Sequence, residues 1–221
     1  MDEKLSVSYG SRMERNQFFA DNFVSFEITK SILNIGGGGE RHLAKAIQSS
    51  DVEVVEVDIC GDSDFLLNLD QIDRLPFPDN SFDIVCAFDV LEHLENFHLV
   101  ISEMVRVSRN KVVVSLPIGF IEIFDLILKR EKSLPSEYGM YSKYYGLPVD
   151  PPSDRHRWFL THDDIERFFR HFAQKKRARV DFFPRNNRSI AHRFLRLLIP
   201  NHIYRNVFCP FLWVQLTKTN V

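Results

Sequence analysis

Four consecutive glycines, Gly36 to Gly39, stand between the apolar residues 32–35 and a stretch of helix-forming composition that begins at Glu40. This order predicts a buried strand, a tight turn and a helix. Glycine suits the turn because a side chain would collide with a ligand lying on the backbone, and because the turn can require a positive φ. The free N–H groups at the helix start favour an electron-rich ligand. The pattern predicts an α/β fold with a ligand-binding turn, although glycine-rich turns also occur as plain loops.

The next acidic residue narrows the choice of ligand. Residues 52–58 are rich in β-branched side chains and predict a second buried strand that ends on Asp58. Asp58 lies about twenty residues after the glycines, where a Rossmann-like fold places a carboxylate beside the ribose hydroxyls of a nucleoside. The alternative is an aspartate that only begins a loop. A nicotinamide enzyme would show the same two features, so these residues alone do not select the cofactor.

A second stretch distinguishes the two cofactors. The loop 75–81 reads Leu-Pro-Phe-Pro-Asp-Asn-Ser, leads into a predicted strand over 82–88, and is followed by Asp89-Val90-Leu91-Glu92-His93. With these motifs, residues 30–117 resemble the class I S-adenosylmethionine-dependent methyltransferases, specifically the small-molecule methyltransferase-domain group. The resemblance implies an α/β, Rossmann-like, doubly wound and mainly parallel seven-stranded sheet with an antiparallel last strand. It also implies S-adenosylmethionine as the cofactor.

The resemblance assigns roles to individual residues of the cofactor site. The glycines would approach the methionine part, Asp58 would bind the ribose, and the adenine would lie against Ile59. Asp70 and Gln71 would lie near the adenine amino group, and the backbone at the end of the fourth strand would meet the cofactor's ammonium group. The implied cofactor-binding residues are Gly36, Gly37, Gly38, Asp58, Ile59, Asp70, Gln71, Ala87 and Phe88. Two residues depart from the family pattern: Asn34, where an acidic residue is usual, and Glu40, where a glycine is common.

The remaining elements alternate between strand and helix, as expected of a mainly parallel sheet. Helices are predicted over 40–49 and 94–107, with a further helix around residues 16–26 at the sheet edge or over the cofactor. Strands are predicted near 30–35, 52–58, 64–68, 82–88, 110–116, 178–183 and 208–217. We expect one domain over 1–221, with a substrate-lid insertion at 131–158 that is rich in tyrosine and proline. The alternative for this insertion is a surface segment that packs on itself.

Composition and charge limit the setting and the partners. The chain has 221 residues, of which 44% are hydrophobic, and no apolar run long enough for a membrane span is found. Three widely spaced cysteines indicate reduced thiols and a cytoplasmic protein. Between residues 167 and 205 there are eleven lysines and arginines against the single acidic residue Asp181, so this region carries +10 while the whole chain carries −2. That asymmetry suits an anionic substrate, a membrane surface or nucleic acid, or a solvated basic face without a partner.

Two histidines are candidates for the catalytic step. Methyl transfer to a hydroxyl group is helped by a general base, and His93 would begin the helix after the fourth strand while His156 would lie in the lid. Each could also be a structural histidine. We expect Glu92 to brace the helix start, and we predict no metal site because His93 and His98 are five residues apart, off the spacing of one helix face.

These observations predict methylation of a small molecule or glycan, at oxygen, with no nucleic-acid partner. A weak resemblance of residues 154–159 to methyltransferases encoded with bacterial polysaccharide genes adds to the glycan expectation. One alternative is a lipid-like or quinone acceptor near a membrane, reached through a basic helix over 188–198 whose apolar face holds Ile190, Phe194, Leu197 and Leu198. We expect that face to pack on the sheet. A non-catalytic binding protein and a nicotinamide oxidoreductase are the alternatives from other classes.

Overall fold

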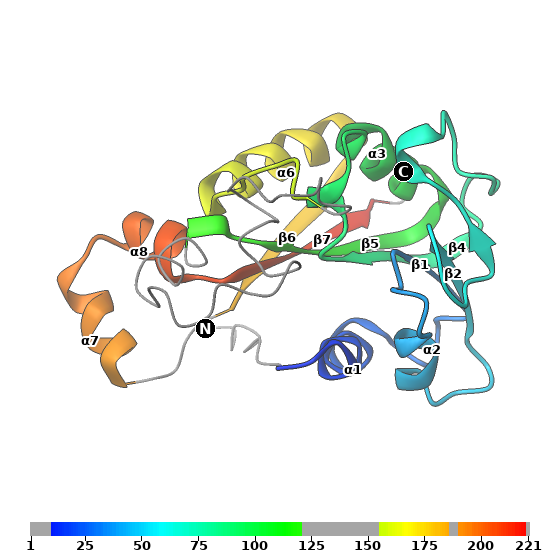
Figure 1. Ribbon diagram of the computed structural model, residues 1–221, viewed down its shortest axis with the longest axis horizontal. Helices are drawn as coiled ribbons and strands as arrows, with labels where there is room; N and C mark the ends of the chain where they lie inside the picture. The colour runs from blue at the N-terminus through cyan, green and yellow to red at the C-terminus, as the bar shows by residue number, and fades with distance from the viewer. Residues whose placement is uncertain (1–9, 121–154, 186–189, 220–221) are drawn as a thin grey trace, which may run out of the picture.

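A single mixed sheet organises the computed structural model, which describes residues 10–120, 155–185 and 190–219. The strand order is β3-β2-β1-β4-β5-β7-β6 (Figure 1). β7 is antiparallel to both of its neighbours and the other adjacent pairs are parallel. The strands are β1 (Ser31–Ile35), β2 (Glu53–Asp58), β3 (Phe65–Leu66), β4 (Phe82–Phe88), β5 (Ser108–Pro117), β6 (Ala178–Pro184) and β7 (Phe211–Lys218). The sheet predicted from the sequence, with its antiparallel last strand, is confirmed.

Helices cover both faces of the sheet (Figure 1). On one face lie α1 (Arg12–Phe23) and α2 (His42–Ala46), and on the other lie α3 (Phe97–Val107) and α6 (His162–Lys176). Every residue of β4 is buried, because successive side chains point to opposite faces and both faces are covered. Two short helices, α7 (Ile190–Leu198) and α8 (Asn201–Phe208), lie together at one end of the molecule.

The helix predicted before residue 30 is confirmed as α1, and it packs on the sheet through aromatic side chains. Ser11 caps it by accepting a hydrogen bond from the Glu14 N–H. The Phe19 ring lies 5.0 Å from that of Phe88, and Phe23 stacks on Trp213 at 5.3 Å between ring centroids. Such pairs favour a fixed docking geometry. α1 therefore packs across the sheet from Phe88 of β4 to Trp213 of β7 and covers this part of one face.

The predicted helix over 94–107 begins later than expected, at Phe97. The segment Leu91–His93 forms a separate 3-10 turn, η2, so His93 does not start the helix. Three hydrogen bonds explain the break. The Glu92 carbonyl accepts the N–H groups of Arg157 and Trp158, while the Asn96 N–H, which would bond to it in a continuous α-helix, donates to Asp70.

The other predicted helix, over 40–49, is shorter than expected. It extends only from His42 to Ala46, because Arg41 takes a left-handed conformation with φ of 51° and Ile47 leaves the helical region. The left-handed residue ends the turn that the glycines begin.

The loop 75–81 is fastened to α3 by a charged pair. The Glu103 carboxylate accepts the Leu75 N–H at 2.9 Å, and the Arg106 guanidinium donates to the carbonyls of Leu75 and Phe77 and to Asp79. Glu103 and Arg106 also pair with each other at 2.6 Å. This clamp sets where β4 begins.

The apolar face of α7 departs from the packing expected of it. Phe194, Leu197 and Leu198 are 63, 81 and 80% exposed, so the expectation that they pack on the sheet is wrong. The cause is the placement of α7 beside α8, beyond the end of the sheet (Figure 1). Ile190, the fourth residue of that face, lies in the helix, and its side chain is outside the described part.

Part of the basic surplus between residues 167 and 205 is paired locally. Arg167 pairs with Asp164, and Arg170 pairs with Glu166, with both acidic residues lying just before the basic region. Arg205 also contacts Glu166. The net positive charge around residues 167–205 is therefore smaller than the sequence count suggests.

Two general expectations can be compared with the described residues. No helix among them has the length and apolar character to cross a bilayer. Cys60 is exposed and Cys86 and Cys209 are buried, and all three are free thiols. Most of the predicted lid, residues 131–154, lies outside the described part of the chain.

Candidate active site

The carboxyl ends of β1, β2 and β4 meet at one edge of the sheet. Gly36, Asp58 and Asp89 follow or end these strands, and the register pairs β1 with both β2 and β4. Ligands of open α/β sheets bind at this edge. The structure therefore brings the predicted glycine turn, the predicted ribose carboxylate and the segment 89–93 to the same place.

Gly36 must be glycine because its backbone is left-handed and the Val90 side chain lies against it. Its N–H donates to the Val57 carbonyl at 2.7 Å, and its φ is +73°. A Cβ atom built on Gly36 would lie 2.2 Å from Cγ2 of Val90. The turn after β1 thus touches the residue that leads into η2, which places the glycine turn and the 3-10 turn side by side.

Asp58 connects the glycine turn to the loop after β2. Its Oδ2 accepts the Gly38 N–H at 2.7 Å, and its Oδ1 accepts the N–H groups of Ile59 and Cys60 at 2.7 and 3.3 Å. Oδ1 also lies 3.9 Å from the Cys60 thiol, whereas Oδ2 accepts a single bond and keeps a lone pair for a hydroxyl group. The Ile59 side chain is 65% exposed and available to pack against a ligand.

The other residues predicted to bind the cofactor differ in their exposure. Asp70 lies in the 3-10 turn η1 (Leu69–Gln71), where its Oδ1 accepts the Asn96 N–H at 3.1 Å and its carbonyl accepts the Asn96 side chain at 2.9 Å. Gln71 is exposed. The side chains of Ala87 and Phe88 are buried, so only their backbone could reach a ligand. Their roles toward the cofactor stay predictions.

Asp89 is a site residue that the sequence argument did not single out. It has a left-handed φ of 55°, its Oδ1 accepts the Ser115 hydroxyl at 2.6 Å, and its Oδ2 pairs with Arg15 of α1. The backbone N–H of Asp89 donates to the Ser115 carbonyl. These contacts fix the turn that leaves β4, and only its place at the head of the segment 89–93 could have drawn attention to it.

Glu56 is the second residue that was missed. It is fully buried beside Asn34, its partner in the β1–β2 register, and the Asn34 amide donates to Oε1 at 3.4 Å. The Oε2 atom has no hydrogen-bond partner in the described structure and lies 2.6 Å from where a Cβ of Gly37 would stand. Burial raises the pKa of the Glu56 carboxyl group. This chain has an amide at position 34, where the family usually has a carboxylate. It carries a buried carboxylate instead at Glu56, the residue paired with Asn34 on the neighbouring strand.

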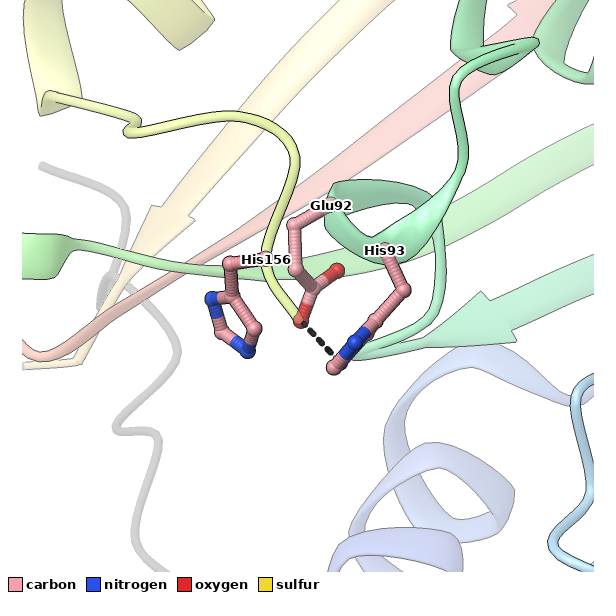
Figure 2. Close-up of side chains that lie close together, drawn as sticks. All are labelled: Glu92, His93 and His156. Atoms are coloured by element: carbon pink, nitrogen blue, oxygen red, sulfur yellow. Dashed lines mark ion pairs between the residues drawn. The ribbon is translucent and has the colours of Figure 1, made fainter. Parts of the chain in front are cut away.

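The two catalytic candidates, His93 and His156, lie together although 63 positions separate them. Figure 2 shows the Glu92 carboxylate between the two imidazoles. The imidazole rings are 4.3 Å apart at an angle of 77°, and Nε2 of His93 is 3.8 Å from Oε1 of Glu92. Glu92 is fully buried and both histidines are half-buried. One ligand atom from each of the three residues lies within 4.8 Å of the others.

This arrangement was missed because only the spacing between His93 and His98 along the sequence was considered. His156 is brought in by the segment before α6, whose backbone bonds to η2. Sequence separation hides such a contact, and no local pattern reveals it.

Comparison with known proteins identifies the domain. Residues 33–116 match the family described as a methyltransferase domain. No curated protein matches the chain. The fold is similar to the methyltransferase domain of the bacterial protein CtHen1-CN (15% identity, 93 and 99% of the two chains covered, TM-score 0.56). It is also similar to a SAM-dependent methyltransferase from Archaeoglobus fulgidus (14%, 95 and 95%, 0.56).

A third similar structure is the plantazolicin methyltransferase BpumL in complex with a pentazolic desmethylPZN analogue and SAH (15% identity, 95 and 83% covered, TM-score 0.57). At these identities the solved structures show a shared fold, and the sequence match covers the glycine turn, Asp58 and the segment 89–93 but not His156. A methyltransferase-domain sequence over residues 33–116 is thus combined with the fold of S-adenosylmethionine-dependent methyltransferases.

Proposed function

We propose that this methyltransferase transfers the methyl group of S-adenosylmethionine to an oxygen atom of a small molecule or glycan. The observation that carries the proposal is the meeting of Asp58, the glycine turn and the pair His93 and His156 at one edge of the sheet. The first two would hold the cofactor, and the histidines would stand beside the acceptor. Methyl transfer is an in-line displacement, so positioning the two reactants supplies much of the rate.

Asp58 is the residue on which cofactor binding depends most. Its carboxylate would accept the ribose hydroxyls with the capacity left by the backbone N–H groups, and the exposed Ile59 would cover one face of the adenine. Because Asp58 also holds the Gly38 N–H, its removal would loosen the turn as well as the ribose contact. Asp58→Asn is therefore a better test than Asp58→Ala, since the amide keeps one acceptor oxygen.

Calorimetry with S-adenosylmethionine, S-adenosylhomocysteine and NAD tests this assignment. We expect the wild type to bind the first two, and Asp58→Asn to weaken binding by about 10- to 100-fold, the value of a hydrogen bond to a charged group. Asp62→Asn is the matched control, because Asp62 lies on the same loop with its side chain 73% exposed. Absence of S-adenosylmethionine binding, or tighter binding of NAD, would refute the proposal.

The acceptor side rests on the two imidazoles and on the segment 131–158 proposed as a lid. Imidazole titrates near neutral pH and can take the proton that a hydroxyl group loses on methylation. The end of that segment is fixed to the site, because the Trp158 indole donates to the Leu94 carbonyl at 2.7 Å. Incubation of metabolite and glycan fractions with methyl-labelled cofactor, followed by NMR of the products, should place the label on oxygen. Label found only on nitrogen or carbon would contradict this part.

A lipid-like or quinone acceptor near a membrane is the second candidate, and the exposed face of α7 favours it. Phe194, Leu197 and Leu198 are exposed on a helix that also carries Arg196, as in helices that lie on anionic bilayers. We expect binding to phosphatidylglycerol vesicles but not to phosphatidylcholine vesicles, and loss of binding in Leu197→Glu. Ile28→Glu is the control, because Ile28 is 70% exposed outside α7. Equal sedimentation with and without anionic vesicles would remove this candidate.

A further inference from the structure

We propose that Glu92, His93 and His156 bind a divalent transition-metal ion at the acceptor side of the active site. The binding itself stands on the geometry of these residues, whereas the use of the ion in catalysis rests on the proposed methyl transfer to oxygen. Nothing in the sequence pattern placed these three residues together.

The three side chains already converge. Their ligand atoms lie within 4.8 Å of one another, and Figure 2 shows the carboxylate of Glu92 placed between the two imidazole rings. Metal ligands in a formed site are closer than this, since each stands about 2.0–2.2 Å from the ion. Small side-chain rotations would close the remaining gap. The Glu92 carboxylate is fully buried, so a cation beside it would face little competition from water.

The backbone holds the ligands in this arrangement from two separate segments. η2 carries Glu92 and His93, and the segment with His156 is bonded to η2 on its carboxyl side. The Glu92 carbonyl accepts the N–H groups of Arg157 at 2.7 Å and Trp158 at 3.2 Å, and the Trp158 indole donates to the Leu94 carbonyl. Arg157 also pairs with Glu95 at 3.3 Å. A site fixed in this way loses little entropy when an ion binds.

The donor set indicates which ions would fit. Two imidazole nitrogens and one carboxylate oxygen suit Zn²⁺, Mn²⁺, Fe²⁺ and Co²⁺, whereas Mg²⁺ and Ca²⁺ prefer oxygen ligands alone. Three protein ligands leave further coordination positions open, as catalytic sites do and closed structural sites do not. The open positions would take oxygen atoms of the acceptor.

The location explains what the ion would do. Val90, two residues before Glu92, lies against Gly36 of the turn proposed to hold the cofactor. An ion at η2 would bind the acceptor hydroxyl and lower its pKa, as metal ions do for bound water. The hydroxyl proton would leave to solvent, the oxygen would form a bond to the methyl carbon, and the carbon–sulfur bond would break to give S-adenosylhomocysteine. The imidazoles would then act as ligands and not as the direct proton acceptors.

The first test uses metal ions alone. After removal of metals with a chelator, titration with ZnCl₂, MnCl₂ and CoCl₂ should show one ion bound per chain, with MgCl₂ much weaker. At an ion concentration 100 times the Kd, the Tm should rise by about 5 to 10 °C for a domain of this size. No binding, or binding of Mg²⁺ as tight as that of Mn²⁺, would overturn the inference.

Variants locate the site. Glu92→Gln, His93→Ala and His156→Ala should each weaken Zn²⁺ binding at least about 10-fold. His98→Ala is the matched control, because His98 is an exposed histidine of α3. His42→Ala tests the pair of His42 with Glu40, which lies at 2.6 Å and could bind ions weakly. Unchanged affinity in the three site variants, or loss in His42→Ala, would overturn the assignment.

Two further measurements keep the result decisive if a variant fails to fold. X-ray absorption of the Zn²⁺-loaded wild type should show histidine nitrogen at about 2.0–2.1 Å, and a spectrum without histidine scattering would overturn the inference. Calorimetry of S-adenosylmethionine on the metal-free protein separates the two proposals. Cofactor binding without metal binding refutes only the metal site, whereas metal binding without cofactor binding refutes only the proposed methyl transfer.

Discussion

Gly37 offers a sharp test of how the glycine turn is built, because buried side chains lie where its Cβ would stand. A Cβ on this residue would stand 2.6 Å from Oε2 of Glu56 and 3.0 Å from the amide nitrogen of Asn34. Both side chains are buried, so neither can move aside freely. Gly37 does not have a positive φ, unlike its neighbours Gly36 and Gly38. The obstacle to alanine at position 37 is therefore contact and not backbone conformation.

The magnitude follows from two opposing effects. Overpacking a buried site costs about 1–3 kcal/mol, and replacing glycine by alanine returns about 0.4–1 kcal/mol by restricting the unfolded chain. Gly37→Ala should thus lower the free energy of unfolding by about 1–2 kcal/mol, or the Tm by about 2–8 °C for a chain of this length. In a Glu56→Ala background the contact with the carboxylate is absent and only the Asn34 amide stays close to the added methyl group, so the same change should cost much less.

Urea unfolding of the four variants of this cycle measures the coupling between positions 37 and 56, which we expect to be about 1–3 kcal/mol. Gly38→Ala is the matched control. Its φ is +77°, and a Cβ there would meet only the flexible end of Arg12, so its cost of about 1–2 kcal/mol arises from the left-handed backbone. That cost should be the same with and without Glu56. Equal penalties for Gly37→Ala in the two backgrounds would refute the contact as the cause.

Further predictions concern Arg106, which fastens the loop 75–81, and two buried titratable residues, His162 and Glu56. Arg106→Lys should cost at least about 2 kcal/mol in urea unfolding, because several guanidinium hydrogen bonds are lost; Arg74→Ala, which breaks a pair that is mostly exposed, should cost no more than about 1 kcal/mol. Burial lowers the pKa of His162 from its ordinary 6.5, so the unfolded chain binds the proton first and stability should fall as the pH drops below 6.5. His162→Leu should reduce that slope, and an unchanged slope between pH 5 and 6.5 would contradict the assignment. Glu56 has the opposite sign: its raised pKa makes the charged form unfavourable in the fold, so Glu56→Gln should gain stability relative to the wild type as the pH rises above 4.5.

The positions of the strands were predictable because local patterns indicate them, and the resemblance implied a mainly parallel sheet with an antiparallel last strand. The β-branched run ending at Asp58 and β4, which is apolar apart from Asp83, favour buried strands. Helix boundaries were less predictable, because they depend on distant groups. The helix after β4 begins at Phe97 only because Arg157, Trp158 and Asp70 take the backbone groups that a continuous helix would use.

The site divides in the same way. The glycine turn and Asp58 lie together as expected, since adjacent parallel strands bring them to one edge. Glu56 was missed because a glutamate among β-branched residues gives no sign of its partner across the sheet, and the contact of His93 with His156 depends on a segment 63 positions away. The exposure of α7 could not be predicted either. The spacing of apolar residues shows that a helix has an apolar face, but it does not show whether that face packs on the sheet.

The motif that resembles the methyltransferases most closely performs two separate tasks. Its first part, the loop 75–81, is fastened by Glu103 and Arg106 of α3, and Asp83 continues the fastening by accepting the N–H groups of Lys30 and Ser31 at the start of β1. These contacts align β1 with β4 and touch no group at the carboxyl edge. The second part, residues 89–93, supplies the polar side chains at that edge. Substitutions in the first part should therefore lower stability before they lower activity. Substitutions in the second part should change what the acceptor side can bind. Resemblance across the whole motif therefore identifies the fold and the cofactor more firmly than the acceptor.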